Sequence, residues 1–128
     1  MTKKNEFKQL GRKVSTYQGL ETFKAPEHLD RVSCITVEVT TLCPVTGQPD
    51  WYTVKIHYIP NKWCVESKSL KLYLQSFRNQ GHFCEDFSQI IAHHLDQVLR
   101  PEEVVVTVIQ KPRGGISIEA TSSIGEMI

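Results

Sequence analysis

Hydrophobic and polar residues alternate along two stretches in the first half of the chain. Over residues 31–42, Ile35, Val37 and Val39 fall on one side of an extended strand, and polar residues fall between them. Residues 51–59 repeat the alternation after an intervening segment that contains two prolines and a glycine. This pattern predicts an antiparallel hairpin.

The middle of the chain changes to helical periodicity. After Ser67, apolar residues occur at i, i+3, i+4 and i+7, which predicts a helix over residues 67–79 with Ser67 as its N-cap. A second stretch with the same period predicts a helix over residues 85–99, and an Arg-Pro pair ends it. Two shorter alternating segments, 104–111 and 116–120, predict a second hairpin around a glycine turn.

The order of these elements predicts an α+β fold. Two strands, two helices and two strands give a four-stranded, mainly antiparallel sheet with both helices on one face. We assign residues 31–128 to this single domain and residues 1–30 to a peripheral or flexible N-terminal arm. The other face and the edges of the sheet lack cover, and association with further copies into a barrel would remove the edges.

Composition narrows the class of protein. The chain of 128 residues fits one domain, and its formal net charge of +1 gives no broad attraction to nucleic acid or membranes. No apolar run approaches the length of a spanning helix. The four cysteines include no CxxC pair, so their spacing does not indicate a metal site. We expect a cytoplasmic protein with reduced thiols.

Two lysines in the first predicted helix are unusual. Lys68 and Lys71 fall in its first turns, where the helix dipole disfavours a cation by about 0.3–1 kcal/mol. They form either a solvated face of an ordinary amphipathic helix or part of a site for an anion such as a phosphate. The spacing alone leaves both readings open.

A family resemblance bears on this choice. The sequence Glu-Ser-Lys-Ser-Leu-Lys-Leu-Tyr at residues 66–73 resembles the signature of the 7-cyano-7-deazaguanine reductases, the nitrile reductases (QueF family) of queuosine biosynthesis. Further matches extend the resemblance over about residues 31–120. It implies the tunnelling fold in its single-module form and a homo-oligomer with active sites between subunits. It also implies NADPH as the cofactor.

The resemblance implies the catalytic residues. Residues 41–50, Thr-Leu-Cys-Pro-Val-Thr-Gly-Gln-Pro-Asp, are similar to the catalytic segment of the family. Cys43 would attack the nitrile carbon and form a thioimide, and Asp50 would donate the proton that the nitrile nitrogen gains. Without the resemblance, a lone cysteine beside a strand is more often a small buried hydrophobe, and aspartate is a common turn residue.

The resemblance also implies the substrate contacts. Glu85, at the start of the second helix, would accept two N–H bonds from the guanine-like base. Val65, Glu66 and Ser67 match further substrate contacts, and Phe83 would stack on the base unless it belongs to the core.

One substrate residue departs from the family pattern. Cys84 stands where the family usually has histidine, and a thiol does not replace the hydrogen bonds or charge of an imidazole. His82 reaches the site instead, or Cys84 makes a reduced contribution, or the enzyme is altered. As a hypothesis, Cys84 also forms a reversible, inactivating disulfide with Cys43.

The cofactor residues implied by the resemblance come from two segments. They are Ser67, Lys68, Ser69, Lys71, Arg113 and Gly114. Arginine suits bidentate contact with phosphate, and glycine lets the backbone approach a ligand closely.

The sequence therefore indicates NADPH-dependent reduction of 7-cyano-7-deazaguanine to the 7-aminomethyl compound, with two hydrides and a free base that requires no nucleic acid. One alternative is an amidine-forming relative, archaeosine synthase, which lacks the cofactor segment. GTP cyclohydrolase I is a more distant rival that needs zinc. A catalytically decayed purine-binding protein is the remaining alternative.

Overall fold

The computed structural model describes residue 10 and residues 16–125. In chain order, the described elements are β1 (Thr22–Lys24), β2 (Val32–Leu42), β3 (Pro49–Ile59), β4 (Trp63–Val65), α1 (Ser67–Gln75), the 3₁₀ helix η1 (Ser76–Asn79), α2 (Cys84–Leu99), β5 (Glu103–Arg113) and β6 (Ile116–Gly125). The helix predicted over residues 67–79 is thus an α-helix whose last turn is 3₁₀.

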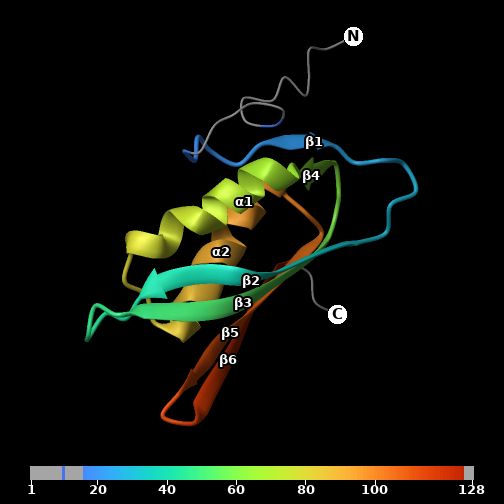
Figure 1. Cartoon of the computed structure of the whole chain (residues 1–128). Helices are drawn as coiled ribbons and strands as arrows, with labels where there is room; N and C mark the ends of the chain where they lie inside the picture. The colour runs from blue at the N-terminus through green and yellow to red at the C-terminus, as the bar shows by residue number, and fades with distance from the viewer. Residues whose placement is uncertain (1–9, 11–15, 126–128) are drawn as a thin grey trace.

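The main sheet has the strand order β2-β3-β5-β6, and each neighbouring pair is antiparallel. Helix α2 lies over β5 and β6, and α1 lies along β2, so both helices cover one face (Figure 1). The predicted α+β architecture is confirmed; β3, β5 and β6 extend one to five residues beyond the predicted ends, and β2 begins one residue later than predicted.

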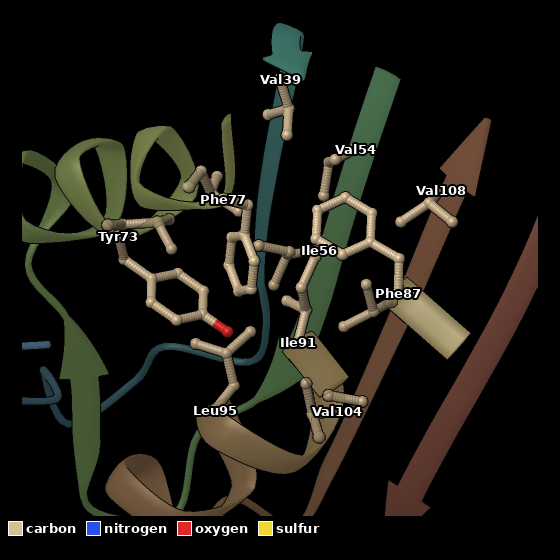
Figure 2. Close-up of a cluster of buried hydrophobic side chains, with 14 of the residues drawn as sticks. Val39, Val54, Ile56, Tyr73, Phe77, Phe87, Ile91, Leu95, Val104 and Val108 are labelled. Atoms are coloured by element: carbon tan, nitrogen blue, oxygen red, sulfur yellow. The ribbon is translucent and has the colours of Figure 1, made fainter. Parts of the chain in front are cut away.

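The core lies between this face of the sheet and the helices. Alternate residues of β3 and β5 point into it, and the largest are fully buried: Tyr52, Val54, Ile56, Tyr58, Val104, Val106 and Val108. Figure 2 shows Phe87, Ile91 and Leu95 of α2 packed against this row, beside Tyr73 and Phe77. Burial of each such side chain contributes roughly 1.5–3 kcal/mol, so β3 and β5 form a rigid platform for the strand ends.

A second, two-stranded sheet was not predicted. β1 pairs antiparallel with β4, with Phe23 opposite Cys64. The Glu66 N–H also donates to the Glu21 carbonyl at 2.8 Å. Of the arm assigned to residues 1–30, residues 1–9 and 11–15 lie outside the described residues, and the part that includes β1 is tied to the domain.

The face assignment of the first strand was wrong. A bulge shifts the pairing of β2 with β3 between Thr36 and Val39. Because one extra residue reverses which side chains face the core, Ile35 and Val37 are 67% and 58% exposed while Val39 is 3% exposed. The bulge therefore leaves two large apolar side chains on the face of the sheet opposite the helices.

Candidate active site

Cys43 follows the last residue of β2 and begins the turn to β3. The Cys43 N–H donates to the Gln48 carbonyl at 2.7 Å, and the Gly47 N–H donates to the Cys43 carbonyl at 2.8 Å. Gly47 has φ of +74°, a conformation that glycine adopts without strain. The turn holds the cysteine backbone at both its N–H and its carbonyl, and only 5% of the residue is exposed.

The surroundings of the Cys43 sulfur favour the thiolate. The Thr46 hydroxyl lowers the pKa of the Cys43 thiol most, followed by the Thr46 N–H, the Arg113 side chain and the Val45 N–H. Together they bring this pKa from 9.0 to about 6. Since a thiolate is the nucleophilic form of cysteine, Cys43 is activated near neutral pH.

Asp50 lies beside Cys43 because the hairpin returns the chain. It pairs with Thr41 across β2 and β3, and it is 4% exposed. Arg113 Nη1 lies 3.2 Å from Asp50 Oδ1 and contacts the Cys43 thiol as well. These three residues, Cys43, Asp50 and Arg113, are called the thiol cluster below.

The position of Arg113 differs from the predicted one in a turn. β5 continues through Arg113, and only Gly114 and Gly115, with φ of +61° and +82°, form the turn. The longer strand carries the guanidinium to the nucleophile. The sequence predicts this arginine only as a cofactor residue.

Two predicted substrate residues lie near the thiol cluster. The loop before α2 is tied to the end of β2, since the Leu42 N–H donates to the Gln80 carbonyl at 2.8 Å and the His82 N–H donates to the Leu42 carbonyl at 3.3 Å. Phe83, in this loop, is 57% exposed, and Glu85 is exposed in the first turn of α2. Both side chains are therefore available to a ligand at this end of the sheet.

Cys84 and His82 point elsewhere. The Cys84 Sγ faces the Ile118 and Val108 carbonyls at 3.6 and 3.8 Å, and burial raises the pKa of this thiol. The His82 ring stacks on Phe87 with centroids 5.9 Å apart, and its Nε2 lies 2.9 Å from Gln80 Oε1. Cys43 and Cys84 are both free thiols.

The start of α1 differs from the prediction. The N-cap is Glu66 and not Ser67: the Glu66 carboxylate accepts from the Lys68 and Ser69 N–H groups, both at 2.7 Å. These N–H groups are therefore already paired with an anion of the chain itself. Ser69 is fully buried, and its hydroxyl donates to the Glu66 carbonyl and accepts from the Glu21 N–H. Ser69 thus anchors the β1 segment.

A cleft of about 380 Å³ separates α1 from β2. Ser67 and Lys71 line it from the helix, and residues 34–36 with Glu38 and the apolar Val39 line it from the strand. Both helix residues are exposed. An exposed cation beside a mixed apolar and polar cleft of this size fits one end of an anionic dinucleotide such as NADPH. Below, the helix cleft means this cleft.

One chain does not bring all the predicted residues together. The Val65 N–H donates to the Tyr58 hydroxyl at 3.0 Å, and Tyr58 pairs with Val32 at the start of β2. Asp50 lies eight residues before Tyr58 on β3, a separation of roughly 26 Å at about 3.3 Å per residue. Figure 1 shows the β2–β3 turn at one end of the molecule and the β1–β4 pair at the other. Residues 65–67 therefore lie far from the thiol cluster.

Among the described residues, no group of three or more His, Cys, Asp or Glu side chains is arranged to hold a metal ion. Within residues 16–125, neither helix is long and apolar enough to cross a membrane.

Known proteins resemble this chain over most of its length. A family model described as "QueF-like protein" matches residues 49–127. A protein of Bacteroides thetaiotaomicron named NADPH-dependent 7-cyano-7-deazaguanine reductase is 46% identical over 129 residues, which cover 95% of this chain and 85% of that protein. A protein of the same name from Bacillus pumilus is 50% identical over 112 residues, which cover 85% of this chain and 67% of that protein.

A solved structure supports the fold. The apo form of the archaeosine synthase QueF-Like superposes with a TM-score of 0.74 at 20% identity, over 80% of this chain and 100% of that chain. At this identity the likeness establishes the tunnelling fold alone.

Proposed function

We propose a mechanism from the premise that this chain belongs to the QueF-like family, whose relatives described above are NADPH-dependent 7-cyano-7-deazaguanine reductases. The reaction is reduction of the nitrile of 7-cyano-7-deazaguanine to the aminomethyl group of 7-aminomethyl-7-deazaguanine, a precursor of queuosine. The observation that carries the mechanism is the thiol cluster, in which an activated sulfur, an acid and a cation meet at one strand end.

Covalent addition is the first step. The Cys43 thiolate attacks the nitrile carbon, one C≡N electron pair moves to nitrogen, and Asp50 gives that nitrogen its proton. The product is a thioimide on Cys43, with Asp50 left as a carboxylate. Arg113 stabilises the thiolate before the attack and the carboxylate after it, because it contacts both.

When bound, the cofactor would supply two hydrides, one to the thioimide carbon and one to the carbon of the imine that remains when the Cys43 thiolate leaves; water supplies the last proton to the amine nitrogen and restores the Asp50 acid. Lys71 and Ser67 at the helix cleft, with Lys68 of the same helix, would hold its anionic part. Arg113 and Gly114 would contact it where the turn after β5 leaves the backbone open. We omit Ser69 from this set because its hydroxyl is buried and bonded within the chain.

Substrate recognition uses the exposed side chains beside the thiol cluster. Glu85 accepts N–H bonds from the pyrimidine ring of the base, and Phe83 stacks on its face. Ser67 contacts the substrate from another subunit, since Tyr58, which binds the neighbouring Val65 N–H, lies roughly 26 Å from Asp50 along β3. We omit the side chains of Val65 and Glu66, because both are buried and the Glu66 carboxylate accepts from the Lys68 and Ser69 N–H groups.

The active enzyme is accordingly a homo-oligomer with sites between subunits. Two observations support this besides the separation of the site residues. The sheet has open edges at β2 and β6, and large apolar side chains are exposed on both strands, among them Ile35 and Val37 on β2 and Ile116 on β6. The free base is the substrate, so no nucleic acid is required, and the four free thiols suit the cytoplasm.

The test compares the wild-type protein with Cys43→Ala. Each is mixed with 7-cyano-7-deazaguanine and NADPH while the absorbance of the reduced cofactor and of the thioimide is followed. The wild type should form the thioimide and consume two cofactor molecules per substrate, and Cys43→Ala should do neither while its assembly stays unchanged. Product formation by Cys43→Ala, or a thioimide without cofactor consumption by the wild type, would contradict the mechanism.

A further inference from the structure

Three buried polar atoms lie behind the thiol cluster without hydrogen-bond partners among the described residues. They are Thr41 Oγ1, Asp50 Oδ1 and Tyr52 Oη. Thr41 and Tyr52 are fully buried, and Asp50 is 4% exposed. Asp50 Oδ1 has the ion pair with Arg113 Nη1 at 3.2 Å but no hydrogen bond of good geometry. Burial raises the pKa of Tyr52 and the neighbouring Thr41 hydroxyl lowers it, so the two hydroxyl groups lie close to each other. Since most buried polar atoms in proteins are fully hydrogen-bonded, this buried row needs a functional explanation.

The strand register gathers these atoms on one face of the sheet. Thr41 lies directly opposite Asp50 in the β2–β3 pair, and Tyr52 is two residues beyond Asp50 on the same strand. Their side chains therefore share the helix side, where the Tyr52 ring packs against Phe87 with centroids 5.1 Å apart. Thr41 and Tyr52 are therefore the neighbours of Asp50 on this face of the sheet.

The groups around Asp50 come from four elements. Arg113 approaches from β5, Cys43 from the turn after β2, Tyr52 from β3 itself and Cys84 from α2. Arg113 donates hydrogen bonds and never accepts them. Cys84 gives Asp50 no hydrogen bond, because its Sγ faces the Val108 and Ile118 carbonyls. The hydroxyl groups of Thr41 and Tyr52 are the other oxygen groups in this row.

The proposed mechanism requires Asp50 to change its protonation state. Before sulfur adds to the nitrile it carries a proton, and afterwards it is a carboxylate. A hydroxyl group accepts a hydrogen bond from a carboxylic acid and donates one to a carboxylate, so it serves both states. A purely donating neighbour such as Arg113 serves only the carboxylate.

We propose that Tyr52 and Thr41 are positioning residues for Asp50, whose hydroxyl groups hold its carboxyl in place through both protonation states. This role rests on the proposed function. Burial raises the pKa of the Tyr52 hydroxyl to about 12, so it keeps its own proton throughout. Asp50 alone donates the proton to nitrogen.

The test uses Tyr52→Phe and Thr41→Val, with the rate of thioimide formation measured as a function of pH. Loss of either hydroxyl removes a partner that fits both protonation states of the carboxyl and leaves Arg113, which fits the carboxylate alone. The rate of thioimide formation should fall ~10-fold, and its pH profile should differ from that of the wild type. Thr41→Ser, which keeps a hydroxyl, should retain the wild-type profile.

Two controls separate positioning from folding. Tyr73→Phe removes a hydroxyl that bonds His94 Nδ1 at 2.7 Å between α1 and α2, and it should leave the pH profile unchanged. In an Asp50→Asn background, Tyr52→Phe should cause no further loss of rate, since the two residues act as a unit. A wild-type pH profile in Tyr52→Phe and Thr41→Val, with or without a lower melting temperature, would overturn the inference. So would additive losses with Asp50→Asn.

These outcomes differ from failure of the proposed function. If the wild-type protein forms no thioimide with 7-cyano-7-deazaguanine, the function itself is wrong. If the wild type forms it and the hydroxyl variants behave like the wild type, only the positioning role is wrong.

Discussion

The two ends of the β2–β3 hairpin carry different parts of the candidate site. At the turn end, Arg113 contacts both Cys43 and Asp50 within one chain, where β2, β3 and β5 end or begin. At the other end, Glu66 and Ser69 are buried and bonded to their own backbone surroundings, and Ser67 and Lys71 are exposed beside the helix cleft. The turn end contains reactive groups in contact, whereas the helix end presents an exposed polar surface.

This difference suits the different requirements of bond formation and ligand recognition. A sulfur, an acid and a cation must lie within contact distance. The ends of neighbouring strands bring such residues together even when they are far apart in the sequence. Recognition of a base and a dinucleotide needs a larger surface than one strand end offers. With roughly 26 Å between the two ends, a second copy of the chain is the natural source of the missing half.

The largest effect is expected from Asp50→Asn, which changes the turn end. An amide does not give up a proton at neutral pH, so turnover should fall by roughly 10²–10⁴-fold. Alkylation of Cys43 by iodoacetamide should persist, because Thr46 and Arg113 still stabilise the thiolate. Turnover within a few-fold of the wild type would mean that another group supplies the proton.

A smaller effect is expected from Lys71→Glu, which changes the helix end. Loss of one charge-assisted contact, with reversal of the charge, should raise the KM for NADPH by roughly 10–100-fold. The rate of Cys43 alkylation should not change. Lys62→Glu, an exposed lysine outside the helix cleft, is the matched control. Equal effects of the two variants on the KM would mean that the cofactor does not bind in this cleft.

Thr46→Val should change the pH dependence of the turn end. The wild-type thiolate should form as pH rises through about 6, because the pKa of Cys43 lies there. The Thr46 hydroxyl is the largest cause of that lowered pKa, so its loss should move the midpoint of Cys43 alkylation upward by about one pH unit. Thr46→Ser should keep the midpoint. An unchanged midpoint in Thr46→Val would mean that the turn N–H groups and Arg113 lower the pKa of Cys43 without the Thr46 hydroxyl.

The smallest effect concerns stability at the helix end. Glu66→Ala removes the cap of α1 and should lower the free energy of unfolding by about 0.5–2 kcal/mol in urea titrations. Ser67→Ala should leave it within about 0.5 kcal/mol, since Ser67 is exposed and does not cap the helix. A larger loss of stability in Ser67→Ala than in Glu66→Ala would mean that Ser67 caps the helix.

The sequence predicts the long elements of the fold well. Alternation over 31–42 and 51–59, and the 3.6-residue period within 67–79 and 85–99, persist over enough residues to mark strands and helices. β1 and β4 have three residues each, too few for a period, and they pair across 40 residues of sequence. The bulge at Thr36–Val39 leaves no mark in the alternation, because apolar residues continue through it.

The candidate site divides in the same way. A hairpin turn is expected to bring Cys43 and Asp50 together, and both lie beside Arg113. Arg113 makes its contacts because β5 continues two residues past its predicted end. The Pro-Arg-Gly-Gly sequence there predicts a turn and not a strand. Glu66 as the cap in place of Ser67 follows from two carboxylate oxygens that reach two N–H groups at once. Tyr52 has the pattern of a core residue, and only the strand register places it on the same face as Asp50 and Thr41.

One measurement tests most directly whether two chains share each active site. Cys43→Ala and Lys71→Glu subunits, each with its own affinity tag, are co-expressed, and the mixed assembly is purified on both tags. Turnover is measured at an NADPH concentration at which neither variant alone is active. Sites between subunits should restore activity to roughly a quarter of the wild type, because random assembly joins an intact turn end to an intact helix end in about one site in four. Activity no higher than in the separate variants would contradict the account, since it would place both ends of the site within one chain.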